Sequence, residues 1–196
     1  QSDSRDMLPT FLALAGEKEL AVKAKCKMVG DIPSTQGFVN REAELEKLSE
    51  MLDSEETKVM VIYGSKGYGT SAMAARFLEK NSQRWSVAWV PMHKSFQNFK
   101  KALEETVGEL VPDFEVQLES PDDMVRQLSG SRTILALDHY FEATDDLVEF
   151  MGGVVSAIKG AEDFKLLITA RENTPSYNRF YTVMDLHDNT VGEVHI

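Results

Sequence analysis

A glycine-rich turn between an expected strand and an expected helix constrains the fold of this chain most. The apolar run at 59–63 leads directly into residues 64–71, GSKGYGTS, and a helical pattern follows at once. Glycines in such a turn let consecutive backbone N–H groups point inward at an anion, and a helix that starts there adds the positive end of its dipole. The order strand, glycine turn, helix therefore predicts an anion-binding loop at the end of a buried strand.

The spacing in this loop is close to the phosphate-binding pattern G-x-x-x-x-G-K-[ST]. Gly64 and Gly69 occupy the outer glycine positions and Ser71 the last hydroxyl position, but Thr70 stands where the pattern has lysine. Two other readings are a plain glycine turn and a dinucleotide-binding fold. The latter fits poorly because the spacing is not G-x-G-x-x-G and the next strand ends in residues 90–93, VPMH, without an acid for a ribose hydroxyl.

Length and composition favour one intracellular domain with an appendage. The chain has 196 residues and 42% hydrophobic content, enough for one full core. It shows neither a run of membrane-spanning length nor a signal peptide, so we expect a soluble, cytoplasmic protein. Cys26 is the only cysteine, which excludes an internal disulfide. Because the chain begins with Gln1, we expect a fragment of a larger protein, without a lid or other domains.

The charge balance argues against nucleic acid as a direct partner. The net charge is −11, so the surface should repel a phosphate backbone on average. Much of the excess lies in residues 112–149, which form either a solvated acidic face or a docking surface for a basic protein partner.

The N-terminal part of the chain reads as a helical arm. Residues 6–28 have a helical pattern, and a break with Gly30 and Pro33 follows. We assign residues 1–36 to an arm, either a helix packed on the domain or a linker from another domain, and residues 37–196 to the domain itself.

Strands and helices alternate through the rest of the chain. Short apolar runs predict strands at 59–63, 87–90, 134–137 and 166–168, with a fifth at 181–186, and helical stripes lie around 45–52, 96–110, 124–128 and 147–158. This alternation predicts an α/β fold, a mostly parallel sheet between two layers of helices.

In such a sheet, ligands lie beyond the carboxyl ends of the strands. The first strand ends in the glycine loop, the third in Asp138 and the fourth at Arg171. An acid at that position can hold Mg²⁺ through water beside Ser71. A cradle for an anion, an acid and an arginine are therefore expected at one edge.

With these residues, the chain resembles the nucleotide-binding core of STAND-type ATPases, relatives of the AAA+ group of P-loop NTPases. Residues 38–42, FVNRE, resemble the family's F-V-G-R-E box, 64–71 its Walker A, 135–138 its Walker B and 167–171 its sensor stretch. The resemblance implies a P-loop three-layer sandwich with strand order 5-1-4-3-2. It also implies ATP or ADP with Mg²⁺ as cofactors, and many relatives are switches, including transcription regulators.

The resemblance also implies roles for individual residues. Ser71 and Asp138 are expected at the metal, and His139 and Arg171 at the reacting phosphate. The residues expected to contact nucleotide are Val39, Arg41, Gly64, Ser65, Lys66, Gly67, Tyr68, Gly69, Thr70 and Ser71.

Three residues depart from the family pattern. Asn40 replaces a glycine, which is mild because asparagine tolerates left-handed backbone. Thr70 replaces the lysine that spans the outer phosphates, and His139 stands where relatives carry a second acid. We therefore expect a regulatory nucleotide-binding domain with impaired or absent hydrolysis. The alternatives are an interaction module with a vestigial pocket and an active ATPase that uses Lys66 and His139.

Overall fold

The computed structural model describes residues 26–93, 95–111, 120–140, 144–171 and 189–196. Within these residues a six-stranded sheet has the order β1-β3-β4-β5-β2-β6, and each neighbouring pair is parallel. The strands are β1 Met28–Val29, β2 Val59–Gly64, β3 Ser86–Pro91, β4 Thr133–Tyr140, β5 Phe164–Arg171 and β6 Val191–His195. The helices are α2 Glu42–Asp53, α3 Thr70–Asn81, α4 Phe96–Leu110, α5 Pro121–Leu128 and α6 Asp145–Ile158.

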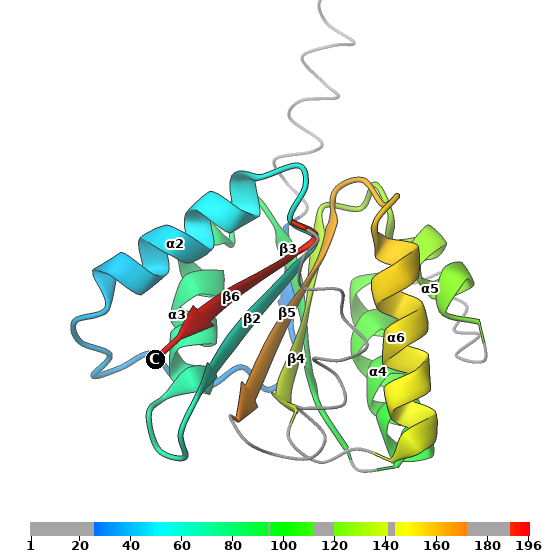
Figure 1. Cartoon of the computed structure of the whole chain (residues 1–196), viewed down its shortest axis with the longest axis horizontal. Helices are drawn as coiled ribbons and strands as arrows, with labels where there is room; N and C mark the ends of the chain where they lie inside the picture. Colours follow the sequence, from blue (N-terminus) through cyan, green and yellow to red (C-terminus); the bar gives the residue numbers. More distant parts are fainter. Residues whose placement is uncertain (1–25, 94, 112–119, 141–143, 172–188) are drawn as a thin grey trace, which may run out of the picture.

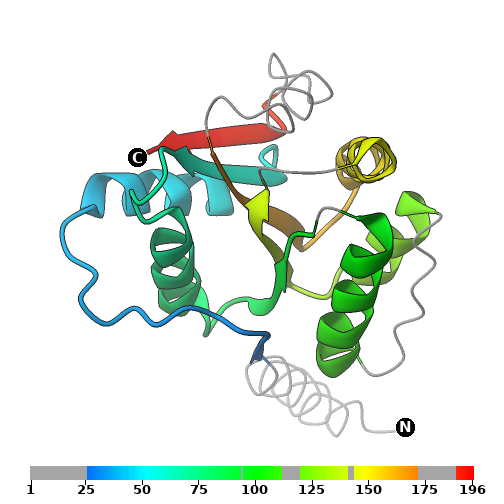
Figure 2. The same ribbon diagram turned by 90° about the horizontal axis from the view of Figure 1, so that it is seen from below.

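Helices cover both faces of the sheet and make a three-layer α/β sandwich. Helices α2 and α3 lie on one face, and α4, α5 and α6 lie on the other (Figures 1 and 2). Successive strand residues point to opposite faces, so Val59, Val61 and Tyr63 join the core with α4 to α6, whereas Met60 and Ile62 join the core with α2 and α3. Burial on both faces explains why the central strands read as continuous apolar runs.

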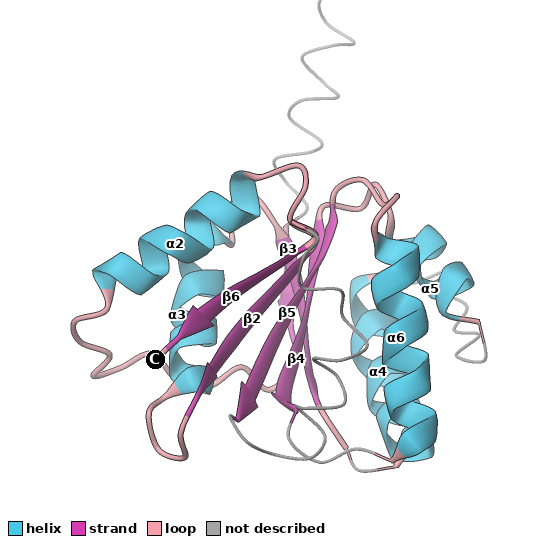
Figure 3. Cartoon of the chain, viewed as in Figure 1, coloured by secondary structure: helices cyan, strands magenta, loops and turns pink. Residues whose placement is uncertain are grey.

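The strand order confirms the P-loop arrangement predicted from the sequence. Read from β6, the order is β6-β2-β5-β4-β3-β1, which is the expected 5-1-4-3-2 with β1 added at the far edge. Strands and helices alternate along the chain as expected (Figure 3).

The two edges of the sheet differ in detail from the sequence analysis. The strand beside β2 is Val191–His195, and the predicted strand at 181–186 lies outside the described residues. At the other edge, Met28–Val29 pairs with β3, so the sheet includes two residues that the sequence analysis assigned to the N-terminal arm. The predicted helix at 6–28 falls almost wholly outside the described residues.

None of the helices in the described part of the chain is long and apolar enough to cross a membrane.

Candidate functional site

The glycine loop is an open turn that ends at the N-terminus of α3. Gly67 and Gly69 have φ of 89° and 83°, a left-handed backbone that suits glycine. A Cβ atom built on either glycine would meet nothing within 4 Å. Gly69 is also the N-cap of α3, no side chain caps the helix, and its first turn has no acid. The first N–H groups of α3 have no partner within the helix, so they and the helix dipole favour an anion in the loop.

The end of β4 brings an acid to the first turn of α3. Asp138 lies on the same face of β4 as Ile134 and Ala136, which pack with α3, and its carboxylate is buried. The Ser71 hydroxyl donates to Asp138 Oδ1 over 2.7 Å. The Thr169 hydroxyl, from the next strand, donates to the same oxygen over 2.5 Å. Asp138 is therefore held in one orientation beside the loop.

His139 is turned toward the same point by an irregularity in β4. The register between β4 and β5 shifts between Leu137 and Tyr140, and His139 has a φ of 64°. Its backbone N–H donates to the Thr169 hydroxyl over 2.9 Å. As a result, His139 Nε2 lies 3.3 Å from Ser71 Oγ and 3.2 Å from Asp138 Oδ2. The structure thus brings the predicted residues Ser71, Asp138 and His139 together.

The start of α2 contacts the loop through Arg41. Its guanidinium donates to the Tyr68 carbonyl over 3.2 Å, which ties the FVNRE segment to the loop. The preceding Asn40 has a φ of 51°, so the asparagine that replaces glycine does adopt the left-handed backbone. The side chains of Val39 and Tyr68 are 74% and 56% exposed. Tyr68 therefore does not close over the loop, and both apolar side chains are accessible at its rim.

Two predicted basic residues lie at different places. Arg171 pairs in register with Gly64, so it stands at the end of β5 next to the first residue of the loop. Lys66 is exposed and makes no hydrogen bond or ion pair with any described residue. It does not substitute for the missing lysine by contact with Asp138.

The oxygen atoms of Ser71 and Asp138 suit a hard cation such as Mg²⁺. Magnesium prefers carboxylate, hydroxyl and phosphate oxygens and keeps several waters. A hydroxyl and a carboxylate oxygen 2.7 Å apart at the mouth of an anion-binding loop supply this type of ligand. These two residues would hold Mg²⁺, and the cation would neutralise charge on a bound phosphate.

Thr169 is the site residue that the sequence analysis missed. It is buried and contacts both Asp138 and His139. The alternation of side chains along a strand could have indicated it, because Leu167, Thr169 and Arg171 lie on the same face of β5.

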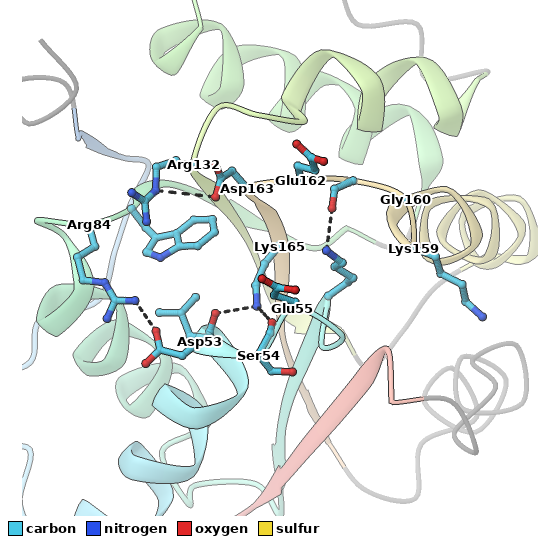
Figure 4. A pocket seen from close by; sticks show the side chains of 14 residues that line it. Asp53, Ser54, Glu55, Arg84, Arg132, Lys159, Gly160, Glu162, Asp163 and Lys165 are labelled. Atoms are coloured by element: carbon cyan, nitrogen blue, oxygen red, sulfur yellow. Dashed lines mark hydrogen bonds and ion pairs between the residues drawn. The ribbon is translucent and has the colours of Figure 1, made fainter. Parts of the chain in front are cut away.

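A pocket of about 610 Å³ lies at the other end of the strands, where they begin. Figure 4 shows Lys165 pointing at the end of α2. Lys165 Nζ donates to the carbonyls of Met51, Leu52 and Ser54 over 3.1, 2.7 and 2.6 Å. Lys58 Nζ likewise donates over 2.8 Å to the carbonyl of Ala161, just after α6.

Lys165 stabilises the end of α2, and Lys58 binds the turn that follows α6. Neither α2 nor α6 has a base in its last turn, and a cation near the carbonyl end of a helix is favourable. Burial, followed by repulsion from Lys58, lowers the pKa of Lys165 to about 8 from its ordinary 10.5, while Asp53 opposes the shift. The two lysines of this pocket therefore have a structural role, which is to bind backbone carbonyls at the end of α2 and just after α6.

A comparison with protein families identifies the domain. Residues 38–150 match the model of an ATPase domain found predominantly in Archaea. The chain belongs to this family. The matched residues span the FVNRE segment, the glycine loop, Asp138 and His139, so the ATPase-like P-loop core predicted from the sequence is confirmed. No curated protein has a matching sequence.

Solved structures with the same fold include three archaeal proteins. Cdc6p from Pyrobaculum aerophilum matches with a TM-score of 0.55 and 16% identity over 84% of this chain and 49% of its own. A STAND protein with a tetratricopeptide repeat sensor from Pyrococcus horikoshii matches with a TM-score of 0.55 and 18% identity over 83% of this chain and 24% of its own. The ORC1 protein of Aeropyrum pernix, solved in complex with DNA, matches with a TM-score of 0.53 and 18% identity over 82% of this chain and 46% of its own.

This likeness shows a shared fold, and together with the family match it supports an AAA+-related P-loop ATPase core. The chain spans half the length of these relatives or less.

Proposed function

We propose that this chain is a nucleotide-binding regulatory domain that binds ATP or ADP with Mg²⁺ and hydrolyses ATP extremely slowly or not at all. The observation that supports nucleotide binding best is the open loop before α3, with the Ser71–Asp138 hydrogen bond at its mouth. Backbone amides bind phosphate without a side-chain charge, so this part of the site survives the change from lysine to Thr70.

The bound nucleotide would lie across the loop from α2 to β5. Val39 and Arg41 would face the base. The loop from Gly64 to Thr70 would bind the phosphates, and Arg171 would lie near the terminal phosphate. Ser71 and Asp138 would hold the cation. Two observations support this path: Arg41 donates a hydrogen bond to Tyr68 in the loop, and Arg171 is in register with Gly64.

Slow hydrolysis follows from two substitutions. Thr70 brings no charge to the outer phosphates, and His139 replaces the acid that polarises the attacking water in relatives. Loss of one transition-state charge donor costs on the order of 10² to 10³ in rate, and positioning plus charge stabilisation supply most of phosphoryl-transfer catalysis. A domain that binds without turning over is suited to act as a switch within a larger signalling or transcription-regulating protein, acting through a protein partner.

Thermal unfolding of the purified protein with MgATP, MgADP, MgGTP and inorganic phosphate tests this proposal. A ligand at 100 times its Kd adds about 2.7 kcal/mol to the stability of the folded state. ATP or ADP should raise Tm by more than GTP or inorganic phosphate does, and ATP should remain intact over hours. Equal shifts for ATP, GTP and phosphate would mean that the loop binds anions only. No shift at millimolar nucleotide would favour an interaction module with a vestigial pocket. Turnover near one per second that Asp138→Ala abolishes would show an active ATPase instead.

A further inference from the structure

The side chains of Ser71, Asp138 and His139 form a small triangle, in which Asp138 turns one carboxylate oxygen to each of the other two residues. Ser71 Oγ lies 2.7 Å from Asp138 Oδ1 and 3.3 Å from His139 Nε2, and His139 Nε2 lies 3.2 Å from Asp138 Oδ2. In an octahedral complex with bonds of about 2.1 Å, neighbouring ligand atoms are about 3.0 Å apart. The three distances in the triangle are close to this spacing, so the three side chains lie near enough to one another to bind a single cation, with Asp138 using either or both of its oxygens.

The backbone is built to bring His139 into this triangle. Side chains alternate along a strand, so residue 139 would normally point away from the face that Asp138 occupies. The register shift between Leu137 and Tyr140 and the φ of 64° at His139 remove this alternation. Residues other than glycine adopt positive φ uncommonly, although histidine does so more often than most. Such positions gather at functional sites, and bulges re-aim side chains next to them. The bond from His139 N to Thr169 Oγ1 keeps the turned backbone in place.

The nitrogen in the triangle sets which cation it favours. Mg²⁺ prefers an all-oxygen shell, whereas imidazole nitrogen binds the later first-row transition metals well. We propose that Ser71, Asp138 and His139 form a cation site that selects a transition-metal dication such as Co²⁺ or Zn²⁺ over Mg²⁺ when nucleotide is bound. This inference rests on the proposed function.

The protein ligands alone leave the site incomplete, which ties the cation to the nucleotide. Among the described residues no group of three or more His, Cys, Asp or Glu side chains comes together, and the third ligand here is a neutral hydroxyl. Phosphate oxygens in the adjoining loop would fill further positions. A cation bound more firmly through His139 would also bring the positive charge that Thr70 does not supply. The His139 side chain is 53% exposed, so an incoming cation can reach it.

The alternative is that the triangle only satisfies its own hydrogen bonds. The contact between Asp138 and His139 is then an interaction within β4 and has no bearing on the choice of cation. Calorimetry of ADP binding separates the two explanations, because only the first makes affinity depend on cation type through His139. Saturating cation removes differences in the cation's own affinity for ADP, and ADP avoids hydrolysis.

The test compares the whole chain with His139→Asn and His195→Asn, each with Co²⁺ and with Mg²⁺. Asparagine suits the left-handed backbone at position 139, and His195 on β6 serves as the matched histidine. The wild type should bind Co²⁺-ADP more tightly than Mg²⁺-ADP by about tenfold or more. Imidazole favours the later transition metals, and even the loss of an outer-shell partner of a metal ligand typically costs 10- to 100-fold in affinity. His139→Asn should bring this ratio near one, and His195→Asn should keep it.

A second readout is independent of affinity. The visible absorption of Co²⁺ should change on addition of ADP and wild-type protein, and this change should be absent with His139→Asn. Equal binding with the two cations, or a preference that survives His139→Asn in a protein of unchanged Tm, overturns the cation inference and leaves the proposed function standing. Failure of ADP to bind with either cation overturns both.

Discussion

Thr70 is the residue at which the loop departs from the phosphate-binding pattern. It is the first residue of α3, next to an open loop on an intact strand and helix. Thr70→Lys completes the G-x-x-x-x-G-K-S pattern without altering a glycine. A charge-assisted contact to phosphate contributes roughly 1.5 to 3 kcal/mol, so calorimetry should show ATP binding tightened by about tenfold or more.

Thr70→Gln is the matched control for this prediction, because it lengthens the side chain without adding charge and should leave affinity near the wild-type value. Hydrolysis should stay slow in Thr70→Lys until His139 is also changed to Glu. Unchanged affinity in Thr70→Lys would mean that more than one missing charge closes the site.

Individual site residues were predictable where a family pattern or a strand end fixed their position. The contact between Ser71 and Asp138 followed from strand ends meeting at one edge, and the left-handed Asn40 from the glycine that it replaces. The contact of His139 with Ser71 was not predictable. It depends on a register shift and a positive φ in β4, and neither leaves a periodic signal in a run of apolar residues.

Among the elements, the end of β2 at Gly64 packs closely against Ile196. A Cβ atom there would lie 2.5 Å from the Ile196 carbonyl oxygen, a backbone atom. Ile196 N also donates to Tyr63 O over 3.0 Å, so this end of the chain is fixed against β2. Gly64→Ala should therefore destabilise the fold by about 1 to 3 kcal/mol, as overpacking typically does, measured by urea unfolding.

Gly192→Ala is an informative control for Gly64→Ala. Its added Cβ would lie 2.7 Å from Met51 Sδ, which belongs to a flexible side chain. The loss of stability should be smaller than for Gly64→Ala. Equal losses would mean that the approach of Ile196 to β2 is not rigid.

Lys165 should give the fold a pH-dependent stability. Its pKa is lowered to about 8 from 10.5, first by burial and then by Lys58. Below pH 8 the lysine is protonated in both the folded and unfolded chain. Between about 8 and 10.5 the unfolded chain binds a proton that the folded chain has lost, so this residue's contribution to stability rises with pH.

The comparison of wild type with Lys165→Met by urea unfolding at pH 7 and pH 10 measures this effect. The variant does not titrate at this position, and it leaves three carbonyls at the end of α2 without their donor. The variant should be less stable at both pH values, and the difference in the free energy of unfolding between wild type and variant should be larger at pH 10. The exposed Lys101→Met is the control, and a gap that narrows toward pH 10 would contradict the lowered pKa.

The elements themselves were predictable to different degrees. Central strands buried on both faces show as apolar runs, so β2 to β5 were found, each shorter than in the structure. The edge strands were not. Two residues of β1 are too few to show a period, and Gly192 and Glu193 interrupt the apolar pattern of β6. Parallel pairing with β2 or β3 supplies what local sequence lacks.

In the molecule as a whole, the two ends of the parallel strands differ in role. The end at which the strands finish carries the glycine loop, Asp138 and His139. The end at which they begin carries Lys58 and Lys165, whose ammonium groups donate to carbonyls at or just after the ends of helices. The charges of these two lysines are therefore used within the fold. This division bears on which partners the chain as a whole can bind.

The chain as a whole should not bind DNA by itself, although one structural relative was solved in complex with DNA. Non-specific binders of DNA neutralise phosphates with clustered lysine and arginine and reach Kd values of roughly 10⁻⁴ to 10⁻⁶ M at physiological salt. This chain has a net charge of −11, with 21 basic and 32 acidic side chains. Fluorescence anisotropy with a labelled duplex at 50 mM salt, with and without MgADP, should therefore show no binding up to tens of micromolar protein. Binding that weakens steeply as salt is raised would instead reveal a basic surface strong enough to overcome the overall charge, and the chain would then be a direct reader of nucleic acid.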